Sequence, residues 1–161
     1  MKRMEEYKRE KEGHFGSDHR GKENSMKNLP QPREQDPFAT KVILLVEDDL
    51  LLSEFLAGMI GMFVSYEVVS ANNAFQALSL TKDVRPDLFL FDYQLPGING
   101  LELYQQLHSQ PTFAKIPVLF VSAVAPKEAF EKQHLPYIGK PFDMDDLLYK
   151  ISWLVTHGQP A

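Results

Sequence analysis

The chain has 161 residues, of which 43% are hydrophobic and 24% are charged, as in a soluble protein with one folded domain. The absence of cysteine excludes disulfides and thiolate metal sites, and the net charge of −5 argues against direct DNA binding, which needs a basic surface. The longest nonpolar run, residues 55–64, is too short for a membrane span of roughly 20 residues, and no apolar secretory signal follows Met1, so we expect a cytoplasmic protein.

The first 40 residues differ in composition from the rest of the chain. They hold nine Lys/Arg and eight Asp/Glu but only eight hydrophobic residues, which are scattered. Such a segment cannot bury enough apolar surface to offset the entropy lost on ordering, although residues 1–11 could form a short charged helix. We therefore predict a disordered tail and linker over residues 1–40, a folded domain over residues 41–157 and a C-terminal tail over residues 158–161.

From residue 41 onward, predicted strands and helices alternate five times. The strands are mostly short, continuous apolar runs, which are typical of strands buried on both faces of a sheet; they span residues 42–46, 66–70, 88–91, 117–121 and 137–139. The helices show apolar spacing or helix-capping residues; they span residues 50–62, 74–81, 101–108 and 127–133, and the segment that Asp143 caps. This alternation predicts an α/β fold with a doubly wound parallel sheet covered by helices on both faces.

Three finer predictions concern individual side chains. The helix over residues 50–62 is expected to bury its apolar positions 52, 55, 56, 59 and 60. Asn72 or Asn73 is expected to cap the second helix. The only tryptophan, Trp153, is interpreted as a core residue.

Polar residues follow four of the predicted strands, where functional groups of parallel sheets gather. The run Glu47-Asp48-Asp49 follows the first strand, Asp92 the third, Ser122 the fourth and Lys140 the fifth. Clustered carboxylates repel one another unless a cation joins them, and oxygen ligands of this kind suit Mg²⁺. With a lysine and a hydroxyl beside them, these residues favour a site for a phosphoryl group.

Each of these residues also has a plainer explanation. Acidic residues after a strand often cap the next helix, and for Asp48-Asp49 taken alone this explanation is as good as a functional one. A lone Asp92 could be a turn residue, and Lys140-Pro141 could be a solvated turn. Their combination, in order, at four strand ends is what favours a functional site.

Four stretches together resemble the receiver domains of two-component response regulators. They are V-I-L-L-V-E-D-D at residues 42–49, P-D-L-F-L-F-D-Y-Q-L-P-G-I-N-G at 86–100, V-L-F-V-S-A at 118–123 and Y-I-G-K-P-F at 137–142. The resemblance spans residues 41–157. It implies a flavodoxin-like fold with five strands in the order 2-1-3-4-5.

The resemblance also implies a phosphoacceptor and a metal site. Asp92 resembles the residue that receives a phosphoryl group from a phosphohistidine on a sensor histidine kinase or a phosphotransfer protein. Asp49, Asp92 and the main-chain carbonyl of Gln94 resemble the Mg²⁺ ligands, and Asp48 would hold the metal's waters or act as a second acid. Glu47 is expected to turn away, because side chains alternate along a strand.

Three further residues match the family's pattern near the last two strands. Ser122 and Lys140 resemble the groups that contact the phosphoryl oxygens, and Tyr137 resembles the aromatic residue whose inward or outward pose reports phosphorylation. The Lys140-Pro141 bond is predicted to be cis, which would aim Lys140 into the crevice. Only 17 residues separate Ser122 from Lys140, so the fourth helix should be short.

These features predict a stand-alone response regulator that catalyses only its own phosphoryl transfer and dephosphorylation. Because the chain stops after the fifth predicted helix, its output is expected to be altered binding to another protein. One alternative is a receiver-like adaptor that is never phosphorylated. Another is an aspartyl-phosphate phosphatase of the haloacid-dehalogenase type, which is disfavoured because Gln94 stands where that class needs a second Asp.

Overall fold

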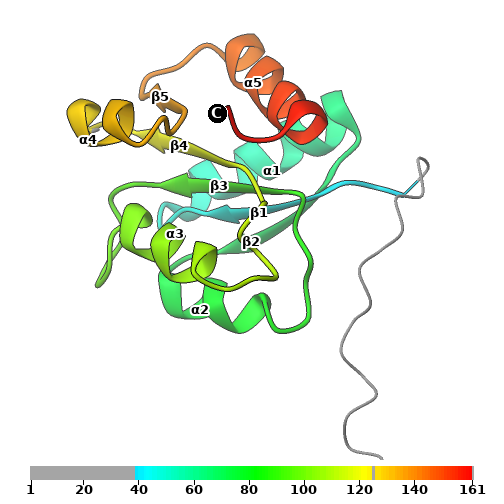
Figure 1. The fold of residues 1–161 in the computed structure, drawn as a ribbon. Helices are drawn as coiled ribbons and strands as arrows, with labels where there is room; N and C mark the ends of the chain where they lie inside the picture. The colour runs from blue at the N-terminus through cyan, green and yellow to red at the C-terminus, as the bar shows by residue number, and fades with distance from the viewer. Residues whose placement is uncertain (1–38, 125, 161) are drawn as a thin grey trace, which may run out of the picture. The chain divides into compact units, whose positions relative to one another are not determined.

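The computed structural model describes residues 39–124 and 126–160, in which strands and helices alternate along the chain (Figure 1). The disordered tail predicted for residues 1–40 lies almost entirely outside the described residues. The strands are β1 (Val42–Val46), β2 (Glu67–Ala71), β3 (Leu88–Asp92), β4 (Val118–Ser122) and β5 (Tyr137–Gly139). The helices are α1 (Leu50–Val64), α2 (Ala74–Leu80), α3 (Gly100–His108), α4 (Lys127–Lys132) and α5 (Met144–His157).

The five strands form one parallel sheet in the order β2-β1-β3-β4-β5, which confirms the predicted flavodoxin-like topology. The register pairs Val46 of β1 with Phe91 of β3, and Asp92 with Val121 of β4. Ser122, the last residue of β4, pairs with Gly139 of β5. The carboxyl ends of these four strands therefore lie at one edge of the sheet, where the sequence placed its polar residues.

Alternate side chains of the strands point to opposite faces of the sheet and fill two separate cores. One core contains Phe89, Phe91 and Phe120 and is covered by α2, α3 and α4. The other contains Leu90 and Leu119 and is covered by α1 and α5. Figure 1 shows α2 and α3 on one side of the sheet and α5 on the other. The two-sided covering explains why the central strands are apolar up to their last residue, where Asp92 ends β3 and Ser122 ends β4.

Helix boundaries agree with the predicted ones to within two residues, and their caps explain why. Asn73, rather than Asn72, caps α2, since its side chain accepts a hydrogen bond from the Gln76 amide. Asp143 caps α5 as predicted. The fourth helix, α4, has six residues, as its short segment predicted. None of the helices in the described part of the chain is long and apolar enough to cross a membrane.

The chain remains attached to the domain beyond α5. The Gln159 side chain accepts a 2.9 Å hydrogen bond from the Val118 amide at the start of β4. Its amide nitrogen lies 3.3 Å from the His134 carbonyl oxygen, to which it donates. The packed structure therefore extends past the expected boundary at His157, at least as far as Gln159.

Candidate functional site

Three carboxylates meet at the carboxyl edge of the sheet. Glu47, Asp48 and Asp92 each place one carboxylate oxygen within 4.8 Å of the others. Glu47 and Asp92 are buried, whereas Asp48 is exposed to solvent. A cluster of this kind concentrates negative charge at the end of the central strand and needs a cation to offset it.

Lys140 supplies part of that positive charge. Its Nζ donates hydrogen bonds to Glu47 Oε2 at 2.8 Å and to Asp92 Oδ2 at 3.0 Å. The Lys140-Pro141 bond is cis, as predicted from the sequence. Burial by itself lowers the pKa of Lys140, but the hydrogen bonds to Glu47 and Asp92 outweigh it, so the pKa is raised. The ammonium group therefore stays charged at neutral pH.

The prediction that Glu47 turns away from the site is wrong. Its side chain is 3% exposed and forms an ion pair with Lys140. Its Oε1 also accepts a 3.2 Å hydrogen bond from the Asp49 amide. β1 ends at Val46, so the strand alternation that motivated the prediction no longer sets the direction of the next side chain. Burial raises the pKa of Glu47, while the hydrogen bond from Lys140 opposes that rise.

The structure does not place Asp49 among the clustered carboxylates, contrary to its expected role as a metal ligand. Its Oδ1 accepts hydrogen bonds from the amides of Leu51 at 3.0 Å and Leu52 at 3.1 Å. Asp49 is thus the N-cap of α1, where a carboxylate satisfies amides that have no partner within the helix. The capping explanation that applied to both aspartates therefore holds for Asp49, and Asp48 is the residue that joins the cluster.

Asp92 is held in place from two sides. Its Oδ1 accepts a 2.9 Å hydrogen bond from the Gln94 amide, and its Oδ2 contacts Lys140. Behind it, the first turn of α3 lies against the backbone, and the Gly100 amide donates to the Tyr93 carbonyl at 2.8 Å. A Cβ atom on Gly100 would overlap the main-chain carbonyl of Asp92, so this contact requires glycine.

Gly100→Ala is therefore expected to lower the free energy of unfolding by about 1–3 kcal/mol, the usual cost of forcing extra atoms into a packed region. The matched control is Gly58→Ala in α1, where a Cβ meets nothing within 4 Å. The free energy of unfolding of that variant should rise by about 0.5–1 kcal/mol, because Ala has a higher helix propensity than Gly. Urea denaturation followed by circular dichroism measures both, and equal effects would show that α3 does not press on Asp92.

Ser122 and Tyr137 lie near the site in other hydrogen-bonding and packing arrangements. The Ser122 hydroxyl donates to the Val124 carbonyl at 3.1 Å and accepts from the Val124 amide at 3.2 Å, within the loop after β4. The half-buried Tyr137 ring packs 5.5 Å from the Phe130 ring of α4. The structure therefore describes one state of each side chain, and their expected response to phosphorylation stays a prediction.

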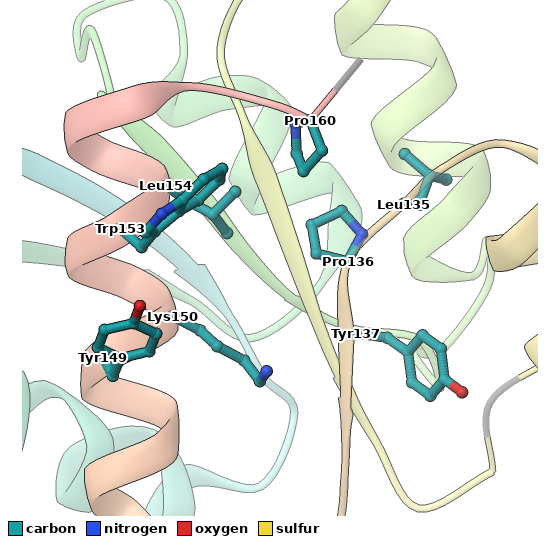
Figure 2. Close-up of a pocket in the computed structure, with 8 residues that line it drawn as sticks. All are labelled: Leu135, Pro136, Tyr137, Tyr149, Lys150, Trp153, Leu154 and Pro160. Atoms are coloured by element: carbon teal, nitrogen blue, oxygen red, sulfur yellow. The ribbon is translucent and has the colours of Figure 1, made fainter.

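A pocket of about 470 Å³ lies between β5 and α5. Figure 2 shows the Tyr137 ring pointing away from Tyr149 and Trp153, which line the α5 side of this pocket. Trp153 is 37% exposed, so the prediction that it belongs to the core is wrong. The buried stripe of α5 consists of Leu147, Leu148, Ile151 and Leu154, and Trp153 lies outside that stripe.

Comparison with known proteins identifies the family. The family model of the response regulator receiver domain matches residues 43–152, which is well over half of the chain. The chain belongs to the receiver domain family. The sequence-based resemblance is therefore confirmed.

The curated relatives include both short and long proteins. The polar-differentiation response regulator DivK of Brucella anthropi is 34% identical over 108 residues, which cover 65% of this chain and 87% of the relative. The phosphate regulon transcriptional regulatory protein PhoB of Pseudomonas aeruginosa is 31% identical over 125 residues, or 75% of this chain and 54% of the relative. The chain thus spans about half the length of several relatives it matches.

A solved structure shows the same fold. A CheY-like receiver domain protein from Methanospirillum hungatei is 30% identical, with a TM-score of 0.66, and the match covers 73% of this chain and 95% of that one. The likeness thus extends over nearly the whole of that receiver domain.

Sequence reasoning missed the role of Glu47. A signal was present, since the apolar run of β1 stops at Val46 and the first of three acids follows directly. The residue next to the end of a buried strand remains near the sheet, where a carboxylate needs a cationic partner. Lys140, at the end of β5, is that partner.

Proposed function

We propose that this receiver domain accepts one phosphoryl group on Asp92 from a histidine kinase or a histidine-containing phosphotransfer protein. The observation that supports the proposal most strongly is the 3.0 Å contact between Asp92 Oδ2 and Lys140 Nζ at the end of the central strand. It joins a nucleophilic carboxylate to a fixed cation beside two further acids. The family membership supports the same role.

In the proposed reaction, an Asp92 carboxylate oxygen attacks phosphorus while the bond from phosphorus to the donor's imidazole nitrogen breaks. The product is an acyl phosphate on Asp92 and a free histidine on the donor. Negative charge spreads over the three equatorial oxygens, and the Lys140 ammonium lies where it can offset that charge. The hydrogen bond from the Gln94 amide keeps the carboxylate oriented.

The donor set fits Mg²⁺. Glu47, Asp48 and Asp92 offer oxygen ligands only, and Lys140 alone does not balance three carboxylates. We assign Asp48, Asp92 and the main-chain carbonyl of Gln94 as the groups that would hold the ion, with Asp48 in place of Asp49. When bound, the ion supplies additional positive charge to the transferring phosphoryl group.

The proposed output is a change in binding to another protein. An acyl phosphate at Asp92 adds charge close to the carboxyl ends of β4 and β5; Ser122 is the last residue of β4, and Tyr137 is the first residue of the three-residue β5. Movement of the Ser122 hydroxyl from the Val124 main chain to the phosphoryl group would alter the space available to the Tyr137 ring. We propose this step as the link between phosphorylation and the surface that binds the partner protein. We further propose that the protein is cytoplasmic, acts as a stand-alone regulator and does not contact DNA directly.

The test uses acetyl phosphate as a small donor and intact mass as the readout. The protein should gain the mass of one phosphate in the presence of Mg²⁺ and should gain none when Mg²⁺ is chelated. A protein that stays unmodified by small donors and by phosphorylated kinases would instead be an adaptor with a fixed surface. That result would contradict the proposal.

Two isosteric variants test the metal assignment. Asp48→Asn is expected to weaken Mg²⁺ binding at least about tenfold, because it removes a charged oxygen ligand. Asp49→Asn should leave binding nearly unchanged, since Asn caps a helix about as well as Asp. Calorimetric titration with Mg²⁺ measures both affinities. Equal losses in the two variants would return Asp49 to the ligand set.

A further inference from the structure

The chain turns sharply where α5 ends and runs back toward the sheet. Gly158 has a φ of 80° and a ψ of −170°, a combination open almost only to glycine, and its amide donates the last hydrogen bond of the helix. Figure 2 shows the chain continuing from the end of α5 to Pro160, which lines the same pocket as Leu135 and Pro136. We call residues 158–160 the strap.

The strap places the Gln159 side chain at the next position of the hydrogen-bond ladder between β4 and β5. Within that ladder, the Phe120 amide donates to the Pro136 carbonyl at 3.1 Å. Bonds of a parallel ladder recur every two residues, so the next one would run from the Val118 amide to the His134 carbonyl. These two groups are joined through Gln159 instead: its Oε1 accepts from the Val118 amide at 2.9 Å, and its Nε2 donates to the His134 carbonyl at 3.3 Å.

The conformation of His134 explains why a side chain takes this position in the ladder. Its φ of 52° lies in the left-handed region, so the residue cannot continue an extended strand. β5 therefore begins only at Tyr137. The primary amide of a glutamine carries an acceptor and a donor on one planar group, so Gln159 can link a main-chain amide to a main-chain carbonyl.

The turn at His134 is also tied to α4. The Leu135 amide donates to the Phe130 carbonyl of α4 at 2.9 Å. Within the six described residues of α4, Phe130 alone is buried, and a helix this short depends on such packing for its stability. The Phe130 ring lies 5.5 Å from the Tyr137 ring. The position of α4, and the ring contact that it makes with Tyr137, therefore depend on the turn that Gln159 holds.

We propose that Gln159 is a positioning residue that holds the turn between α4 and β5 against β4 and thereby opposes displacement of the Tyr137 ring from Phe130. An arrangement that shifts this turn must break at least one of the two hydrogen bonds of the Gln159 side chain. The positioning role does not depend on phosphoryl transfer, but its effect on phosphorylation rests on the proposed function, in which the Tyr137 ring moves. By linkage, a contact that favours the unphosphorylated arrangement disfavours the phosphorylated one.

Amide hydrogen exchange of the full chain, resolved by NMR, tests the positioning role. In Gln159→Ala, the amides of Val118 and Leu135 should both exchange about fivefold faster or more, the effect of losing one hydrogen bond. Gln159→Glu keeps the acceptor for Val118 but has no donor for the His134 carbonyl, so only Leu135 should exchange faster. Unchanged exchange of Leu135 in both variants would overturn the proposal.

Phosphorylation by acetyl phosphate with Mg²⁺, followed by intact mass, provides a readout that lost stability alone would not improve. Gln159→Ala should reach half-phosphorylation at an acetyl phosphate concentration about two- to fivefold lower than the wild type requires. The matched control is Gln110→Ala, which removes an exposed side chain that donates to the Gln106 carbonyl, and it should behave as the wild type in both experiments.

A Gln159→Ala protein that needs as much acetyl phosphate as the wild type, or more, would overturn the proposed opposition to Tyr137 movement. If neither the wild type nor any variant gains phosphate, the proposed function fails. Hydrogen exchange then still decides whether Gln159 holds the turn, because that measurement needs no phosphorylation.

Discussion

Asp92→Asn is expected to abolish phosphorylation of this protein by acetyl phosphate. An amide is not a nucleophile toward phosphorus under these conditions, and the variant also removes one carboxylate from the cluster with Glu47 and Asp48. Intact mass after incubation with the donor and Mg²⁺ should show no added phosphate. The fold should persist, because an Asn side chain has the same shape and its oxygen can still accept the hydrogen bond from the Gln94 amide.

The control for this variant is Asp83→Asn, which changes an exposed aspartate in the loop between α2 and β3. It should be phosphorylated as the wild type is. If Asp92→Asn gains phosphate at the rate of the control, another residue is the acceptor. Peptide mapping of the modified protein would then identify that residue.

Lys140→Ala is expected to slow phosphorylation by about 100-fold or more, the usual effect of losing one fixed donor at a site of developing charge. Lys140 Nζ lies 2.8 Å from Glu47 and 3.0 Å from Asp92, and the variant leaves both buried carboxylates without that cation. The rate of mass gain from acetyl phosphate at saturating Mg²⁺ measures the effect. Circular dichroism establishes that the variant is folded before rates are compared.

Lys150→Ala is the matched control. Lys150 forms a 3.5 Å pair with Asp146 within α5, and both side chains are substantially exposed. Such surface ion pairs contribute little to stability, so the phosphorylation rate of Lys150→Ala should stay close to that of the wild type. A Lys140→Ala rate equal to that of Lys150→Ala would mean that the ammonium group has no part in the transfer. Lys140 would then serve only to balance the charge of Glu47.

The sequence was sufficient to predict the fold and the edge of the sheet where the site lies. Apolar runs long enough for strands alternate with helical segments, and parallel strands must carry their carboxyl ends to a common edge. Asp92 and Lys140 could therefore be placed together although 47 residues separate them along the chain. The cis Lys140-Pro141 bond was predicted as well.

Only the tertiary structure decided that two of the three consecutive acids, Glu47 and Asp48, belong to the site. Glu47 is buried against Lys140, Asp48 joins the carboxylate cluster, and Asp49 caps α1. The direction of each side chain depends on the residue at which β1 ends and α1 begins, and a shift of one residue reassigns all three. The amino-acid composition and the spacing of the three acids are the same whichever acid takes which role, so they could not distinguish these assignments.

The orientation of α1 was likewise beyond the sequence. Its residues are apolar on nearly every side, so periodicity does not distinguish the face that packs on the sheet from the face that meets solvent. Packing against the sheet and α5 selects Leu56 and Ile60 for the core and leaves Phe55 outside. The sequence by itself thus determined the topology and the chemical character of the strand ends. The direction of individual side chains was decided by packing, because it depends on contacts between segments that are distant along the chain.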